Sequence, residues 1–414
     1  MYISFKIIDA MREQKLKDKL EEINHELINN GELDSPDIGV LSGSSGLALF
    51  HFYYNAYNPN EISEDVGSEI IAAIVGTINE GYNFHTFCGG IAGAAWTIEL
   101  LNELEFIEVD TDGLLGILDD YLHHVANLHD QGNFFDFLHG IIGIGYYFLK
   151  RYENTKSSEL KSRYERMLIE MILLLKERSK KSDHGIYWES FLIREEGLKG
   201  CNLSLSHGLS SIINFLSRLS SHKAFSEHTL PLLNQSISHL LNYKKDQADA
   251  SFFPDWITDK NQESQSNRLA WCYGELGVAV SLWRASKVLQ NKKVKETAIE
   301  LLEYAATRRD IEETRIVDGG LCHGAFGVMH IFDYMYKETS NNTFKEAADY
   351  WIDYGLTIDH HKDGSAGYKK WRGGDTPTYE KENSLLEGIA GIGLAILSYL
   401  NPEKTDWNQC LMIG

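Results

Sequence analysis

Apolar residues in this chain gather into short blocks, and a pair of glycines three residues apart opens each block. The blocks are SGSSGLALF, GGIAGAAWTI, HGIIGIGYYFL, HGLSSIINFL, YGELGVAVSLW, HGAFGVMHIF and EGIAGIGLAIL. Their first glycines are Gly43, Gly90, Gly140, Gly208, Gly274, Gly324 and Gly388. The fourth block has Ser211 in place of its second glycine. Self-similarity over the whole length predicts a repeat architecture with seven copies.

Each copy predicts one buried helix. Glycines at i and i+3 share a helix face, so the start of the helix can approach a neighbouring backbone closely. The apolar residues that follow predict burial on most sides. Amphipathic stretches between the copies predict outer helices, with apolar faces such as Tyr164, Leu168, Met171 and Leu175 in one and Val294, Ala298, Leu301 and Ala305 in another.

The spacing of the copies predicts how the helices are arranged. Successive first glycines lie 47 to 68 residues apart, and about fifty residues suffice for one buried helix, one amphipathic helix and two loops. We therefore expect an all-α fold, an α/α toroid of seven inner and seven outer helices, forming a single domain over residues 1–414. The longer intervals leave room for insertions around 183–200 and 357–382. Either insertion could contain strands or a segment that binds the substrate. An open solenoid is the alternative.

Composition narrows the possible partners and the compartment. The net charge of −21, without a basic run, argues against a nucleic-acid partner. Charged residues interrupt the first twenty positions, unlike a signal peptide, and no stretch reaches the length of a membrane span. Five scattered cysteines do not resemble a disulfide framework. We expect a cytoplasmic protein with reduced thiols or metal ligands.

Reactive side chains recur at two fixed positions before the first glycine of each copy. Two residues before it stand Cys88, Cys272 and Cys322, and one residue before it stand His139, His207, His323 and Glu387. Equivalent positions of a closed ring of repeats face the same end of the ring. Residues far apart in the sequence are therefore predicted to converge there.

Three of these residues predict a zinc site. Cys272 from the fifth copy and the pair Cys322 and His323 from the sixth supply two thiolates and an imidazole, and a count of three leaves a fourth position open, as in catalytic zinc sites. Two alternatives stay open: the cysteines could be small buried apolar residues, or Cys88 could complete a closed structural site. Because two cysteinates donate charge to the metal, such a site suits activation of a thiol more than hydrolysis.

Other polar residues cluster in the segments around these positions. Asp136 occurs in FFDFLHG, Asn202 and His207 in CNLSLSHG, and Arg268 and Trp271 in NRLAWCYG. Each has an ordinary structural interpretation as a capping aspartate, a hydrogen-bonded core histidine or a packed tryptophan. His207 shares its repeat position with His323, which favours a functional role.

The motifs CNLSLSHG, NRLAWCYGELG and GGLCHGAFG, with the earlier D-x-x-x-G-x-x-G and the late EGIAGIG, resemble the lanthionine synthetase C family and its bacterial lantibiotic cyclases. The resemblance extends from about residue 38 to 400. It implies the α/α toroid with a small extension, and one Zn²⁺ per chain held by Cys272, Cys322 and His323. It also implies catalytic roles for His207, Asp136, Arg268 and Trp271. His139 and Ser211 depart from the family pattern.

The resemblance implies a lanthionine synthetase. A peptide cysteine thiol adds to dehydroalanine or dehydrobutyrine, and protonation at the α-carbon completes a thioether ring. His207 is the expected acid, Asp136 assists proton transfer or holds a partner, and Arg268 orients acid groups or stabilises negative charge. Either His207 or Asp136 could be the base that takes the proton of the thiol. The expected partners are a dehydrated precursor peptide, a lantibiotic dehydratase and an ABC exporter at the inner face of the membrane.

Three other functions compete with this interpretation. A thiol-alkylating prenyltransferase would need a basic cluster for a diphosphate, which the sequence lacks. A toroidal glycosidase would need paired carboxylates such as Asp136 and Glu387, and would leave the zinc ligands unexplained. A non-catalytic zinc-stabilised module that binds a peptide or glutathione remains the alternative of another class.

Overall fold

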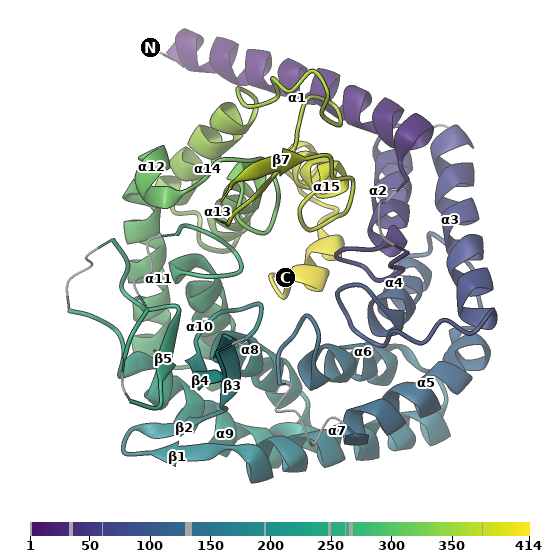
Figure 1. Ribbon diagram of the computed structural model, residues 1–414. Coiled ribbons are helices and arrows are strands. Elements are labelled where there is room, and N and C mark those ends of the chain that lie inside the picture. Colours follow the sequence, from purple (N-terminus) through teal and green to yellow (C-terminus); the bar gives the residue numbers. More distant parts are fainter. Residues whose placement is uncertain are drawn as a thin grey trace. The chain divides into compact units, whose positions relative to one another are not determined.

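The computed structural model describes residues 2–414 except 33–35, 60, 129–134, 194–195, 247–249, 261, 265–267 and 375 (Figure 1). The chain divides into two compact units. The first unit comprises Met1–Tyr82 and Ile316–Gly414, and the second comprises Asn83–Arg315. The first unit therefore contains repeats one, six and seven, and the second contains repeats two to five.

Every repeat forms its predicted helix, which begins at the residue after the first glycine of the pair. These inner helices are α2 (Ser44–Tyr57), α4 (Ile91–Glu103), α6 (Ile141–Asn154), α8 (Leu209–Ser220), α10 (Glu275–Leu289), α13 (Ala325–Thr339) and α15 (Ile389–Leu400). Apart from Ser44 in α2, the residues of their first turns are buried. The first glycine is the N-cap of each helix and offers no side-chain cap.

The predicted outer helices are also present in the described part of the chain. They are α1 (Tyr2–Asn30), α3 (Glu61–Asn79), α5 (Thr111–Leu128), α7 (Ser158–Arg178), α9 (Lys223–Leu241), α11 (Lys292–Thr307) and α14 (Asn342–Gly355). Each packs on one inner helix: α3 on α2, α5 on α4, α7 on α6, α9 on α8, α11 on α10, α14 on α13 and α1 on α15. The apolar faces predicted for α7 and α11 are buried. The short helix α12 (Ile311–Thr314) and a final 3-10 helix (Asp406–Leu411) complete the helices described.

The second glycine of a repeat provides space for the neighbouring repeat. In the second unit, a Cβ added to Gly143 would lie 2.4 Å from the Phe137 carbonyl oxygen and 2.6 Å from the Phe87 side chain. At Gly277 the corresponding side chain is Leu205, at 2.8 Å. Phe87 and Leu205 belong to the segment before the first glycine of the preceding repeat. The close approach predicted from the glycine spacing is confirmed.

In the first unit the same contact joins the last repeat to the first. A Cβ on Gly46 would lie 2.7 Å from the Leu385 side chain. The backbone N–H of Leu386 donates to the Leu41 carbonyl oxygen at 2.8 Å, and α15 packs against α2. The first and last repeats of an open solenoid lie at opposite ends. This contact therefore favours the closed arrangement.

Backbone hydrogen bonds link the segments before the glycines in neighbouring repeats. In the second unit, Cys88 N–H donates to Leu138 at 2.9 Å and Leu205 N–H donates to Cys272 at 3.1 Å. In the first unit, Cys322 N–H donates to the Leu386 carbonyl oxygen at 2.9 Å. Because these bonds join main chains, they hold the side chains that precede the glycines in fixed relative positions within each unit.

Both predicted insertions carry short strands. Strands extend slightly beyond the first predicted insertion of 183–200: the antiparallel pair β1 (Lys180–Ser182) and β2 (Gly185–Tyr187) is followed by the antiparallel pair β3 (Ser190–Ile193) and β4 (Leu198–Asn202). The second contains the hairpin of β6 (Lys370–Arg372) and β7 (Thr378–Glu380).

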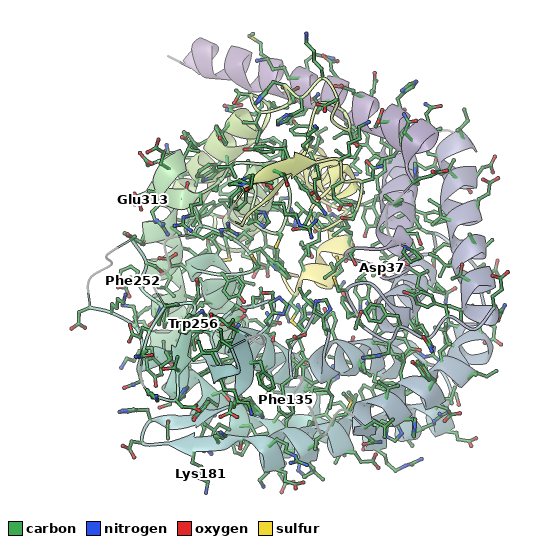
Figure 2. All side chains as sticks on the ribbon, viewed as in Figure 1. Asp37, Phe135, Lys181, Phe252, Trp256 and Glu313 are labelled. Carbon is green, nitrogen blue, oxygen red and sulfur yellow. The ribbon has the colours of Figure 1, made fainter. Side chains whose placement is uncertain are left out.

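One strand was not predicted. β5 (Trp256–Thr258) pairs with β4 and completes a three-stranded sheet. It comes from the interval between the fourth and fifth repeats, where Phe252 packs edge-on against Tyr304 with ring centroids 4.9 Å apart. Figure 2 labels Trp256 and Phe252 in this region, and Lys181 on β1. The three residues of β5 are too few to show an alternating pattern in the sequence.

Candidate active site

His207 lies in the turn that joins β4 to α8 in the second unit. Asn202 ends β4, and its Oδ1 accepts the Ser204 backbone N–H at 2.9 Å. Ser204 Oγ then accepts the His207 backbone N–H at 3.0 Å. Gly208 caps α8 directly after His207, and a Cβ there would lie 2.2 Å from the Asn202 carbonyl oxygen. The turn is thus held by side chains of its own sequence, which fixes where the imidazole begins.

The structure brings Asp136 to His207, as the sequence predicts. His207 Nδ1 and Asp136 Oδ2 are 3.3 Å apart, and Asp136 Oδ1 accepts the His139 backbone N–H at 2.6 Å. Burial raises the pKa of Asp136, but the hydrogen bond and charge of His207 outweigh it, so the pKa is lowered overall. Asp136 is therefore a carboxylate at neutral pH, with both of its oxygens engaged.

Two further rings surround His207. The His139 ring is stacked on the His207 ring, with centroids 5.7 Å apart and planes inclined by 23°. The Tyr273 ring lies 6.3 Å from it on another side, and its hydroxyl accepts the Asn202 Nδ2–H at 3.1 Å. Burial raises the pKa of Tyr273, so its hydroxyl is protonated. Sequence analysis overlooked Tyr273, although it stands one residue before Gly274, where His207 stands before Gly208.

The other residues predicted in the second unit lie just before α10. Trp271 is 1% exposed and Cys272 is 6% exposed, while Arg268 is half-buried. Gly274 has φ of +96°, unlike the other six N-cap glycines, and a Cβ there would lie 2.4 Å from the Arg268 carbonyl oxygen. This turn therefore requires glycine directly after Tyr273.

Cys322 and His323 lie in the first unit, in the turn before α13. Cys322 is partly exposed and His323 is buried. His323 Nε2 is 3.3 Å from Asp318 Oδ2, and Asp318 is 3% exposed. Sequence analysis missed Asp318. It stands six residues before Gly324, and a Cβ on Gly324 would lie 2.4 Å from Asp318 Oδ1.

Glu387 occupies the equivalent position of the seventh repeat. Burial raises its pKa, while the charges of His323 and Lys370 act in the opposite direction. Lys370 Nζ lies 3.8 Å from Glu387 and 2.6 Å from Glu382. The hairpin β6–β7 thus brings a cation to this part of the first unit.

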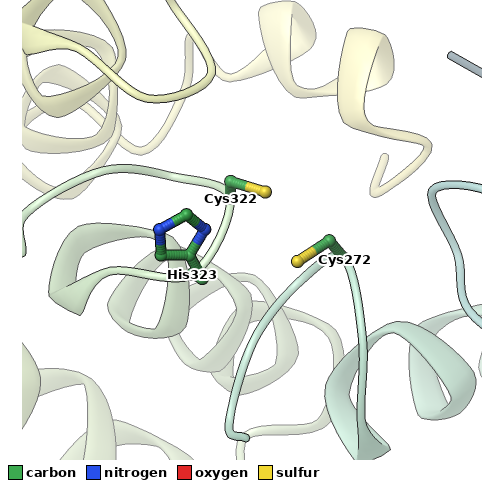
Figure 3. A group of neighbouring side chains, drawn as sticks. All are labelled: Cys272, Cys322 and His323. Atoms are coloured by element: carbon green, nitrogen blue, oxygen red, sulfur yellow. The ribbon is translucent and has the colours of Figure 1, made fainter. Parts of the chain in front are cut away.

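Cys272, Cys322 and His323 form a group that could hold a metal ion (Figure 3). Two thiols and one imidazole are the donor set of a catalytic zinc site, with a fourth position left for water or substrate. A carboxylate behind the imidazole, here Asp318, commonly orients a metal-bound histidine. The residues therefore fit zinc. Among the described residues Cys88 is not part of this group, so the closed structural site lacks its fourth ligand.

None of the described helices is long and apolar enough to cross a membrane.

Comparison with known proteins gives a matching family and several matching solved structures. The family described as "Lanthionine synthetase C-like protein" matches residues 34–412. Nisin cyclase is similar at 20% identity and a TM-score of 0.73, over 96% of this chain and 97% of its own. A D-mannose isomerase has a TM-score of 0.40 at 14% identity over 65% and 71% of the two chains. A sugar epimerase from a ruminal bacterium has 0.46 at 12% over 93% and 99%.

The likeness to nisin cyclase concerns nearly the whole of both chains. At 20% identity it shows the fold, and it confirms the predicted fold class of an α/α toroid with small strand-bearing insertions. The isomerase and the epimerase have TM-scores below 0.5, and nothing about this chain is inferred from them.

Proposed function

Since this chain belongs to the lanthionine synthetase C-like family, we propose that it is a zinc-dependent cyclase. It adds cysteine thiols of a dehydrated precursor peptide to dehydroalanine or dehydrobutyrine, which forms lanthionine or methyllanthionine rings. The observation that carries the proposal is the histidine–carboxylate pair of His207 and Asp136, together with a donor set suited to thiol activation.

One zinc ion per chain would be held by Cys272, Cys322 and His323. When bound, it would keep the thiol of the substrate cysteine in its thiolate form at neutral pH, which makes the sulfur a nucleophile. The two cysteine ligands lessen the Lewis acidity of the metal. This donor set therefore suits thiol addition better than hydrolysis.

His207 is the acid–base residue of the proposal. The carboxylate of Asp136 favours a hydrogen on Nδ1, so Nε2 is the nitrogen that exchanges a proton with the substrate. As the C–S bond forms at the β-carbon, the electron pair of the double bond moves to the α-carbon and the carbonyl. His207 Nε2 takes the proton that the substrate thiol gives up and then delivers it to the α-carbon, so that the addition is balanced.

Asp136 and Arg268 support this proton transfer in different ways. Because both Asp136 oxygens already accept hydrogen bonds, Asp136 orients His207 and balances its charge, and the proton is carried by the imidazole. Arg268 is proposed to stabilise the negative charge of the enolate. Trp271, which is almost fully buried, supports the segment that presents Arg268 and Cys272.

The family membership also motivates proposals beyond the chain itself. We expect a cytoplasmic enzyme that works with a lantibiotic dehydratase and an ABC exporter at the inner face of the membrane. Copurification of the three proteins from cells would test these contacts.

Ring formation can be measured directly with purified protein and a dehydrated precursor peptide. Free thiols are alkylated and counted by mass spectrometry, with and without a metal chelator. We expect thiols to disappear with the protein, to persist with the chelator, and to disappear again when zinc is restored. Zinc binding without loss of thiols would support the non-catalytic binding module instead.

Cys272→Ala should abolish zinc binding and ring formation together, because the donor set falls to two. Cys88→Ala is the matched control, since Cys88 is equally buried at 6% exposure and also stands two residues before a first glycine. The control should keep one zinc per chain and its activity, measured by metal analysis and thiol counting. One zinc per chain with undiminished cyclisation in Cys272→Ala would contradict the proposal.

A further inference from the structure

Asp318 joins the ligand histidine to the hairpin β6–β7, and we propose that it is a positioning residue that couples the two. Its carboxylate fixes the imidazole of His323, and the seating of the hairpin fixes the carboxylate. This inference rests on the proposed function, because it concerns how a zinc ligand is held. All the residues involved belong to the first unit.

The carboxylate of Asp318 is buried among three nitrogen atoms. Oδ1 accepts the Gly320 backbone N–H at 3.2 Å, and Oδ2 accepts the Trp371 backbone N–H at 2.8 Å. Oδ2 also lies 3.3 Å from His323 Nε2. Because Asp318 is almost fully buried, these contacts are protected from solvent and hold the carboxylate in one orientation.

The ion-pair contact with Nε2 favours one nitrogen of His323 over the other as the atom available to a metal. A carboxylate at Nε2 favours a hydrogen on that atom, so the lone pair resides on Nδ1. The main chain of Asp318 also contributes, since its carbonyl oxygen accepts the Ala325 N–H at 2.9 Å in the first turn of α13. Asp318 therefore contacts both the turn that carries the ligand histidine and the far nitrogen of its ring.

The hairpin reaches the same segment by two contacts. Trp371 lies on β6, and its backbone N–H donates to Asp318. Tyr379 lies opposite Trp371 on β7, and its hydroxyl donates to the Val317 carbonyl oxygen at 3.5 Å. A shift of the hairpin would disturb both contacts, whose acceptors are the Val317 carbonyl oxygen and the side chain of the next residue, Asp318. A peptide that contacts the hairpin would thus act on the orientation of His323.

The first repeat supplies a control for the position itself. Asp37 stands six residues before Gly43, as Asp318 stands before Gly324, and its Oδ2 accepts the Ser42 hydroxyl at 3.0 Å. The backbone carbonyl oxygen of Asp37 likewise accepts the Ser44 N–H, at 3.1 Å. The local turn is therefore the same, but no ligand-type side chain occupies the place of His323.

The first experiment measures the zinc dissociation constant of Asp318→Asn by competition with a chromogenic chelator. We expect binding about 10- to 100-fold weaker than in the natural protein, and a changed visible spectrum after Co²⁺ substitution. Asp37→Asn should leave both unchanged. Circular dichroism and urea unfolding establish that both variants are folded. Equal zinc affinity and an equal Co²⁺ spectrum in Asp318→Asn would overturn the inference.

The second experiment isolates the hairpin contact. Trp371→Pro removes the indole and the backbone N–H, whereas Trp371→Ala removes the indole alone. Because the N–H points to Asp318, the proline does not remove a hydrogen bond to β7. We expect zinc binding several-fold weaker in Trp371→Pro than in Trp371→Ala. Equal affinities would overturn the coupling to the hairpin.

The outcomes separate this inference from the proposed function. If the natural protein binds no zinc that depends on Cys272, the proposed function and the inference fail together. If it binds zinc through Cys272 and Asp318→Asn binds it as tightly, the inference alone fails.

Discussion

Single side chains in this protein owe their chemistry to the residues that stand immediately around them. His207 has one nitrogen directed to Asp136 and one face covered by the His139 ring. His323 has Asp318 behind it. In both cases a carboxylate lies close to one ring nitrogen, which favours the other nitrogen as the one that exchanges a proton or binds a metal. In the proposed function these two histidines, which stand at the same repeat position, have different roles.

If His207 is the acid–base residue, His207→Ala should lower kcat by about 10²- to 10⁴-fold without loss of zinc. His139→Phe should have a smaller effect, because phenylalanine preserves the stacked ring but carries no proton. Initial rates of thiol loss, with metal analysis of each variant, provide the measurement. An equal loss of activity in His139→Phe would mean that His139 carries the proton instead.

Helices pack in this protein through glycines at positions where a neighbouring main chain or side chain comes very close. A Cβ on Gly391 in α15 would lie 1.8 Å from the Leu385 carbonyl oxygen and 2.8 Å from the Leu321 side chain. The fourth repeat is the exception, and there the Ser211 hydroxyl donates to the Gly208 carbonyl oxygen at 2.7 Å. The hydroxyl is satisfied within its own turn, so the departure from the family pattern leaves no buried donor unpaired.

Gly391→Ala should destabilise the protein by about 1–3 kcal/mol, since an added methyl group must displace main chain. Gly116→Ala is the matched control in the outer helix α5, where a Cβ would meet nothing within 4 Å. It should stabilise by about 0.5–1 kcal/mol, because alanine loses less entropy than glycine in a helix. Urea unfolding measures the free energy of unfolding of both variants. An unchanged free energy in Gly391→Ala would contradict the close packing at this glycine.

The whole chain is expected to form one domain over residues 1–414, although its contacts divide into two units. The first unit combines both ends of the chain, and the last repeat contacts the first within it. The first unit is therefore discontinuous in sequence, whereas the second is the continuous stretch Asn83–Arg315. That the chain forms a single domain with insertions remains a prediction, and it concerns whether the two units unfold together.

A single domain predicts one cooperative unfolding transition, for which the calorimetric and van't Hoff enthalpies agree. Zinc at one hundred times its dissociation constant should add about 2.7 kcal/mol to the free energy of unfolding. Its predicted ligands, Cys272 and the pair Cys322 and His323, come from both units, so the transition should move as a whole. Two separate transitions in the scan, with zinc affecting only one, would contradict the prediction.

The sequence by itself determined the inner and outer helices, because glycine spacing and apolar periodicity are local and recur seven times. It also indicated the zinc ligands and His207, since equivalent positions in a repeat occupy equivalent places. The repeats also share a polar position further from the first glycine than the two positions directly before it. Six residues before it stand Asp37, Asn202, Arg268, Asp318 and Glu382, a column that sequence analysis overlooked.

Only the tertiary structure decided which of these polar residues meet. Asp318 became a partner of His323 because its chain folds back beneath Gly324, and Trp371 joined them from an insertion more than forty residues away. β5 and Tyr273 became visible for the same reason. Such contacts depend on the paths that the connecting loops take, and neither apolar periodicity nor helix propensity specifies the path of a loop. The apolar pattern determined the helices, and folding of the connecting segments determined the surroundings of the site.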